Sequence, residues 1–215
     1  MADGNNPGPF GYGGGFTGIG SKLFDLWMLG MLWLLCSIPV LTIGASTTAL
    51  YYAVTHSVKS DDGYASHMFF RSFRRNFRQA TILWLVLVGL FMLMRLNTGI
   101  LMALTEGTPG LVMIGFYTAV MVYIVLTGCY MFPALSRFEM DTFWFLRIAI
   151  YMGVRYIFTS LMLLLIVGGA AALIWRFPIL ILVLPGPAVW LMAAFLEGVL
   201  DRHGPKPAGG DETPE

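Results

Sequence analysis

Four long stretches without a charged residue constrain this chain more than any other feature. They cover residues 26–55, 107–136, 156–175 and 177–196. A helix needs about 20 consecutive, mostly apolar residues to cross the hydrocarbon core of a bilayer. Only 12% of the chain is charged, whereas a soluble domain carries about 25%, so too few polar side chains exist to cover a water-facing surface. The sequence therefore predicts an all-α integral membrane protein.

About five transmembrane helices are expected, with short interfacial amphipathic helices between them. Pro39 should kink or end the first span, and Ser46 or Thr47 should cap a short helix that continues through Val58. Pro178 suits the first turn of the last span. The expected spans are residues 23–43, residues 80 to at least 94 and as far as 104, and residues 111–131, 156–174 and 179–195.

Composition shifts divide the chain into three parts. Residues 1–21 hold eight glycines and two prolines, which predicts a flexible tail, and the polar residues 203–215 predict a disordered one. Residues 22–202 form the helical transmembrane domain. Within it, residues 47–54 and 132–140 each precede a basic, aromatic-rich segment and a span. This pattern favours two weak parallel repeats plus a last helix, although cytoplasmic helix starts share such a composition without any repeat.

The distribution of Lys and Arg predicts the orientation in the membrane. Ten of these residues fall on one side of the expected spans, and three, Lys22, Arg95 and Arg176, fall on the other. Cytoplasmic segments are the ones enriched in Lys and Arg. We therefore expect an external N-terminus and a cytoplasmic C-terminus.

The sequence FFRSFRRNFR, residues 69–78, stands just before the second expected span and contains no acidic residue. At 100° per residue its arginines form one stripe and its phenylalanines another, which predicts an amphipathic helix at the membrane interface. Such a helix would anchor the span in an anionic leaflet or dock a partner protein. Nucleic acid is not expected as a partner, because the patch is short and tied to a span. The residues expected to make these contacts are Arg71, Arg74, Arg75, Arg78, Phe69, Phe73 and Phe77.

Polar features inside the expected spans are few. No span interior holds a carboxylate that could relay protons or bind sodium. If the second helix continues to Leu104, Arg95 lies within the membrane and needs a partner, unless its side chain extends to the external interface. Pro185, Gly186 and Pro187 interrupt the fifth expected span midway. Such a break is either a packing kink or the kind of site that transporters use to bind solutes.

No catalytic or metal-binding pattern is recognisable in the sequence. Cys36 and Cys129 lie in apolar runs without a second Cys or His at ligand spacing, and the three histidines are isolated from one another. The glycines at 11–15 follow no predicted strand, as a nucleotide-binding loop would require. We therefore expect no enzyme, no cofactor and no metal.

The segment LWLLCSIPVLTIGASTTALYYAV, followed by DDGY and FFRSFRRNFRQATILWL, resembles the YesL-like family, domain of unknown function 624. The resemblance is most specific over residues 32–87. It implies a multi-pass protein of the bacterial plasma membrane, encoded in many genomes beside carbohydrate importers of the ATP-binding-cassette (ABC) type. It brings no catalytic residues. The expected function is a non-enzymatic accessory protein, with ABC sugar importer subunits as candidate partners; the alternative is a small transporter or channel.

Overall fold

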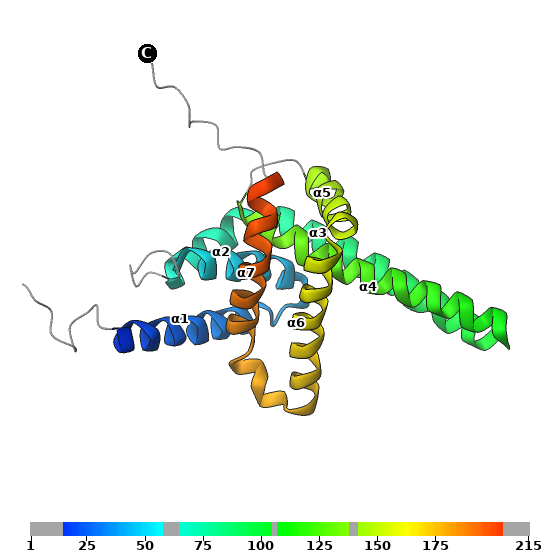
Figure 1. Ribbon diagram of the computed structural model, residues 1–215, viewed down its shortest axis with the longest axis horizontal. Helices are drawn as coiled ribbons and strands as arrows, with labels where there is room; N and C mark the ends of the chain where they lie inside the picture. The colour runs from blue at the N-terminus through cyan, green and yellow to red at the C-terminus, as the bar shows by residue number, and fades with distance from the viewer. Residues whose placement is uncertain (1–14, 58–64, 105–106, 138–141, 204–215) are drawn as a thin grey trace, which may run out of the picture.

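The computed structural model describes residues 15–57, 65–104, 107–137 and 142–203 (Figure 1). Within these residues all regular secondary structure is helical, which confirms the all-α prediction. The elements are α1 (Gly15–Cys36), η1 (Val40–Thr42), α2 (Ile43–Ser57), α3 (Ala65–Leu104), α4 (Thr108–Arg137), α5 (Thr142–Arg155), α6 (Ile157–Arg176), η2 (Pro178–Leu182) and α7 (Pro185–His203).

In the described part of the chain, three helices are long and apolar enough to cross a membrane. They are Ala65–Leu104, Gly110–Arg137 and Ile157–Arg176, and they coincide with the second, third and fourth expected spans. A shorter apolar helix, Pro185–Leu200, overlaps the second half of the fifth expected span and continues beyond it. Large apolar side chains are exposed along these helices, as expected of a lipid-facing surface; examples are Leu85, Leu90, Leu96, Phe116, Phe158 and Leu165.

The first expected span is divided, because α1 ends at Cys36 and the chain turns before α2. The Thr42 hydroxyl stabilises this turn by donating to the carbonyls of Cys36, at 2.5 Å, and Pro39, at 2.6 Å. The expected cap by Ser46 or Thr47 is wrong. Helix α2 already begins at Ile43, and both hydroxyls donate to carbonyls of the preceding turn.

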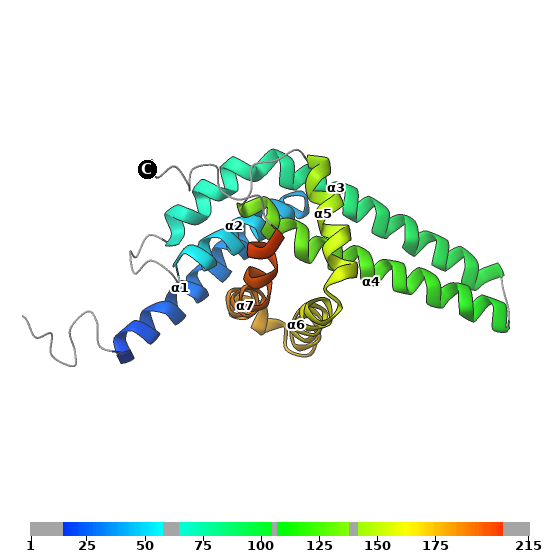
Figure 2. The same ribbon diagram turned by 45° about the horizontal axis from the view of Figure 1, so that its top comes forward.

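Two parts of the fold can be followed in the ribbon drawings. Helices α1, α2 and the first half of α3 lie side by side, and α1 and α3 run in the same direction with α2 opposite (Figures 1 and 2). The rest of α3 and most of α4 extend away from this group as a two-helix hairpin. Helices α6 and α7 run across the direction of the hairpin in Figure 1. The two segments that suggested parallel repeats differ in their helices. Residues 47–54 lie in the separate helix α2, whereas residues 132–137 end the long helix α4.

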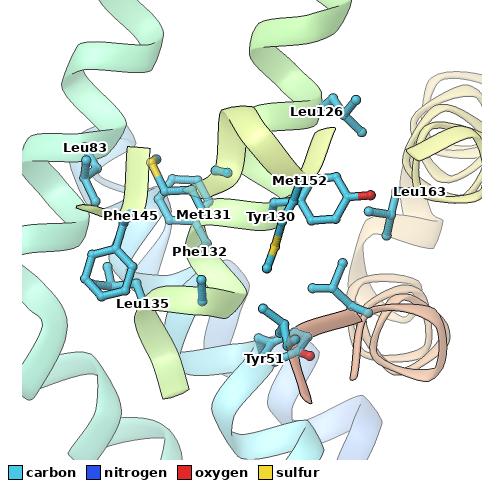
Figure 3. Close-up of a cluster of buried hydrophobic side chains, with 14 of the residues drawn as sticks. Tyr51, Leu83, Leu126, Tyr130, Met131, Phe132, Leu135, Phe145, Met152 and Leu163 are labelled. Atoms are coloured by element: carbon cyan, nitrogen blue, oxygen red, sulfur yellow. The ribbon is translucent and has the colours of Figure 1, made fainter. Parts of the chain in front are cut away.

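The main hydrophobic core lies where α2, α3, α4, α5, α6 and α7 meet (Figure 3). Tyr51, Phe132, Phe145 and Met152 are buried there. Gly44 allows the start of α2 to approach α3 closely, since a Cβ atom on it would lie 2.7 Å from the Ala80 carbonyl oxygen. This approach fixes the position of α2 against the middle of α3.

Candidate functional site on the first half of α3

The FFRSFRRNFR segment is the first part of α3 and is continuous with the apolar part. Forty residues at 1.5 Å each make a helix of about 60 Å, roughly twice the hydrocarbon thickness of a bilayer. The arginine-containing part of α3 therefore extends beyond any span that the apolar part makes. Figure 2 shows α3 as an arch rather than a straight rod.

One face of this part of α3 packs against the protein. Phe69 is fully buried in a cluster with Ala53 and Val54 of α2, and Ala65 belongs to the same cluster. Phe73 is partly buried against both core clusters. The expectation that the Phe69 ring lies in the acyl boundary of the membrane is therefore wrong, because α2 covers it.

Two other aromatic rings remain outside. Phe77 is 41% exposed and Phe70 is 43% exposed. They lie about 80–100° around the helix from Phe69, at the border between its buried and exposed faces. The aromatic stripe expected from the sequence is thus divided into an inner part that packs on protein and an outer part that is available for contact.

The arginines lie on the face opposite the buried one. All four are exposed, and at 100° per residue they point about 140–240° away from Phe69. Like charges at i, i+3 and i+4 destabilise a helix by a few tenths of a kcal/mol per pair, and α3 carries no acidic residue to offset this. We call this surface the arginine face; it consists of Arg71, Arg74, Arg75 and Arg78.

Arg95 lies in the apolar half of α3 and is exposed. The helix continues to Leu104, as the sequence allowed, so Arg95 is about 13 Å from its end. Neither α3 nor α4 contains an acidic residue that could pair with it. Extension of the side chain toward the membrane surface is the interpretation that requires no partner.

Pro185, Gly186 and Pro187 form the first turn of α7. The helical path is interrupted just before these residues, but the interruption separates two elements and does not lie midway along one helix, because η2 ends at Leu182 and α7 begins at Pro185. A Cβ atom on Gly186 would collide with the Leu26 carbonyl oxygen of α1. The shallow apolar pocket nearby is lined by Ala171, Ile174, Trp175 and Pro178, so it lies at the α6–η2 turn and not at this break.

No metal-binding chemistry was found in the described part of the chain. It contains no group of three or more His, Cys, Asp or Glu side chains that could hold an ion. Cys36 and Cys129 are free thiols. Among the described residues, the arginine face is the densest cluster of like charge.

Comparison with known proteins finds a family model that matches the part of the chain carrying the arginine face. Residues 26–98 match the family model described as "Protein of unknown function, DUF624". This segment belongs to the DUF624 family. It covers about a third of the chain and runs from α1 through most of α3. No curated protein and no solved structure matches the chain.

The DUF624 match confirms the resemblance drawn from residues 32–87, and it includes both the arginine face and the α2 surface that orients it. Helices α5, α6 and α7 lie outside the matched residues. Because this family has no defined function, what the protein does follows from its chemistry as a proposal.

Proposed function

We propose that this DUF624 protein is a non-enzymatic accessory protein of the bacterial plasma membrane, and that its arginine face docks an acidic surface of a partner on the cytoplasmic side. The observation that supports this most directly is the placement of four exposed arginines opposite the face that packs on α2. The same helix continues into a segment of spanning length. Docking on this face would couple a partner to the membrane through one rigid element.

The buried Phe69 favours docking over simple anchoring. An anchor helix holds itself in the interface with its rings, but here α2 covers Phe69 and partly covers Phe73. The arginine side chains therefore project from a helix whose orientation is already fixed. A preorganised surface loses less entropy on binding than a mobile one.

The chemistry of the face defines the partner. Guanidinium groups bind carboxylates through paired hydrogen bonds, and Phe70 and Phe77 add exposed apolar area at its edge. The partner surface should carry Asp and Glu around an apolar patch. The resemblance to a family linked to carbohydrate uptake makes a subunit of an ABC sugar importer the first candidate.

The orientation is part of this proposal. The N-terminus is placed outside and the C-terminus in the cytoplasm, as the positive-inside rule predicts. This requires α1 to cross the membrane, although Leu26 and Leu29 of α1 share a cluster with Phe69 next to the arginine face. A reporter fused after Pro207 tests the side of the C-terminus, and a cysteine at Gly107 tests the side of the turn between α3 and α4.

Transport through the break at Pro185, Gly186 and Pro187 remains the alternative function. The close approach of Gly186 to Leu26 gives this motif a packing role, so we favour docking. Solute flux into liposomes that contain only the purified protein would favour transport instead.

Co-purification tests the proposed docking. Membranes are solubilised in mild detergent, and the proteins retained by the wild type are compared with those retained by the R74Q/R78Q variant. We expect loss of one stoichiometric partner from this variant. The R147Q/R155Q variant, which removes two charges from α5, serves as the matched control and should retain it. Equal retention by both variants would contradict docking through the arginine face.

A further inference from the structure

Helix α5 is held in one orientation by hydrogen bonds from α4 and α6. The Tyr123 hydroxyl donates to the Ile150 carbonyl at 2.7 Å. The Ser160 hydroxyl donates to the Gly153 carbonyl at 3.0 Å. Gly153 is in the last turn of α5, where carbonyls lack a complete set of intrahelical donors, so Ser160 completes the end of the helix.

Tyr130 extends this arrangement into the core. Its hydroxyl lies 3.0 Å from the Ser160 hydroxyl oxygen, and both atoms are buried. Since the Ser160 proton goes to Gly153, the Tyr130 hydroxyl is the donor in this second bond. The two bonds join α4, α6 and α5. Tyr130 and Met152 belong to the main core and are both labelled in Figure 3.

The inner face of α5 is apolar and fully packed. Phe145, Ala149 and Met152, which follow i, i+4 and i+7 spacing, are each no more than 1% exposed. They belong to the main core. Packing and hydrogen bonds together hold α5 in one orientation, and its opposite face is turned outward.

The outer face combines arginines with apolar side chains. Ile150, Tyr151 and Val154 are 43%, 51% and 64% exposed, and Arg147 and Arg155 flank them. These residues follow i, i+3, i+4, i+7 and i+8 spacing and cover one side of the helix. The Arg155 guanidinium carbon lies 6.0 Å from the centre of the Tyr151 ring, which orients it beside an aromatic surface.

Helix α6 is long and apolar enough to cross a membrane, and such a crossing puts this face at a membrane boundary. Only Tyr156 separates Arg155 from α6, and the 20 residues of α6 make about 30 Å, the thickness of the hydrocarbon core. At the far end of α6, Trp175 is 90% exposed beside Arg176. Trp is enriched at membrane–water interfaces, as expected if this end of α6 reaches the other side of the bilayer. Helix α5 and the α6–η2 turn lie at opposite ends of α6 in Figure 1.

We propose that the outer face of α5 is a binding surface for anionic phospholipids of the leaflet in which α6 begins. Ile150 and Val154 enter the acyl boundary, and Arg147 and Arg155 bind headgroup phosphates. Helices α3, α4, α5 and α6 contain no acidic residue that would compete for these guanidinium groups. The surface is distinct from the arginine face, which lies on α3 opposite the buried Phe69.

A lipid leaflet fits this face better than a protein does. At 100° per residue Ile150 and Val154 lie within about 60° of Arg147 on one side, and Tyr151 and Arg155 lie within about 80° on the other. Long arginine side chains can reach headgroup phosphates from these positions while the neighbouring apolar side chains enter the acyl boundary. Each basic residue near an anionic leaflet strengthens attraction severalfold, so loss of both arginines should weaken apparent binding of anionic lipid about 30-fold.

Thermal unfolding in mixed micelles tests the proposal. Phosphatidylglycerol or phosphatidylcholine is titrated into detergent-solubilised full-length protein, and the mole fraction giving half-maximal rise in Tm is measured. We expect phosphatidylglycerol to stabilise the wild type, the R147Q/R155Q variant to require far more of it, and the charge-conserving R147K/R155K variant to respond nearly like the wild type. An unchanged response of R147Q/R155Q would overturn the proposal.

A second variant distinguishes lipid from other ligands. A cysteine at Ile150, in a chain whose two native cysteines are replaced by alanine, carries a polarity-sensitive dye. Its emission should shift to the blue in phosphatidylglycerol liposomes and remain unchanged with soluble glycerol phosphate. A shift with glycerol phosphate alone would indicate a free-anion site, and a water-exposed dye in liposomes would indicate a protein-facing surface. Either outcome would overturn lipid binding by α5.

Discussion

Replacement of Gly186 by alanine should destabilise the protein more than any other single glycine-to-alanine change in the α1–α7 contact. The added Cβ atom would collide with the Leu26 carbonyl oxygen, and its neighbours there are backbone atoms that no rotamer change can move. Forcing a methyl group into a packed contact costs about 1–3 kcal/mol. Because Tm shifts by about 2–4 °C per kcal/mol in a chain of this size, the expected fall is about 2–12 °C.

Two glycines provide matched controls for this change. A Cβ atom on Gly30, on the other side of the same crossing, would lie 3.4 Å from the Gly186 nitrogen, which is close to ordinary contact. A Cβ atom on Gly168 of α6 would meet nothing within 4 Å, so alanine there should stabilise the helix by about 0.5–1 kcal/mol. The assay is thermal unfolding in detergent. If Gly186→Ala and Gly168→Ala give the same Tm, α7 does not approach α1 as described, and the packing interpretation of this motif is wrong.

Three further predictions concern orientation, the buried polar chain and the break at α7. A reporter fused after Pro207 should behave as cytoplasmic and a cysteine at Gly107 should react from outside; reaction at Gly107 only after permeabilisation would reverse the orientation. Ser160→Ala should lower the free energy of unfolding by about 1–3 kcal/mol, because it leaves the buried Tyr130 hydroxyl without an acceptor. Adding Tyr130→Phe in the same chain should recover part of this loss. Thermal unfolding is the measurement, and an unchanged Tm for Ser160→Ala would contradict the role of these bonds in holding α5. A P185A/P187A variant should give the same liposome flux as the wild type, and a specific loss of flux at equal expression would favour the transporter alternative.

The spans that the sequence predicts best are those where apolar length alone decides. Helix α6 matches its prediction closely, because a 20-residue uncharged run can satisfy its backbone in lipid only as a helix. Helix α3 also continues to Leu104, as the sequence permitted. In these segments the lipid surroundings alone require a helix, so the helix can be predicted without knowledge of any tertiary contact.

The turn after α1 could not be placed as well. Pro39 indicated a break near the right position, but the helix already ends at Cys36, where the Thr42 hydroxyl reaches back to the Cys36 carbonyl. A hydrogen bond between residues six positions apart in a turn produces no periodic pattern in the sequence, so it could not be predicted. Ser46 and Thr47 lie within α2 and not at its cap, and their hydroxyls donate to the carbonyls four residues earlier.

The candidate site was predicted in its charges but not in its packing. Exposure of the arginines follows from the cost of burying a charge. Burial of Phe69 depends on α2, whose small residues Ala49 and Ala53 belong to the same cluster. A usable signal was present on α3 itself, because the small residues Ala65, Ser72 and Ala80 lie on the same face as Phe69 and are all buried. Small residues on an aromatic face indicate close helix packing more than contact with lipid.

Site-specific photocrosslinking tests docking by the arginine face most directly. A photoreactive amino acid replaces Arg74 on that face, and in a control chain it replaces Leu90, which is 44% exposed in the apolar half of the same helix. After irradiation of living cells, the position 74 variant should form a single protein adduct of stoichiometric yield, and the position 90 variant should form lipid adducts. Lipid adducts alone at both positions would contradict a docking function for this face.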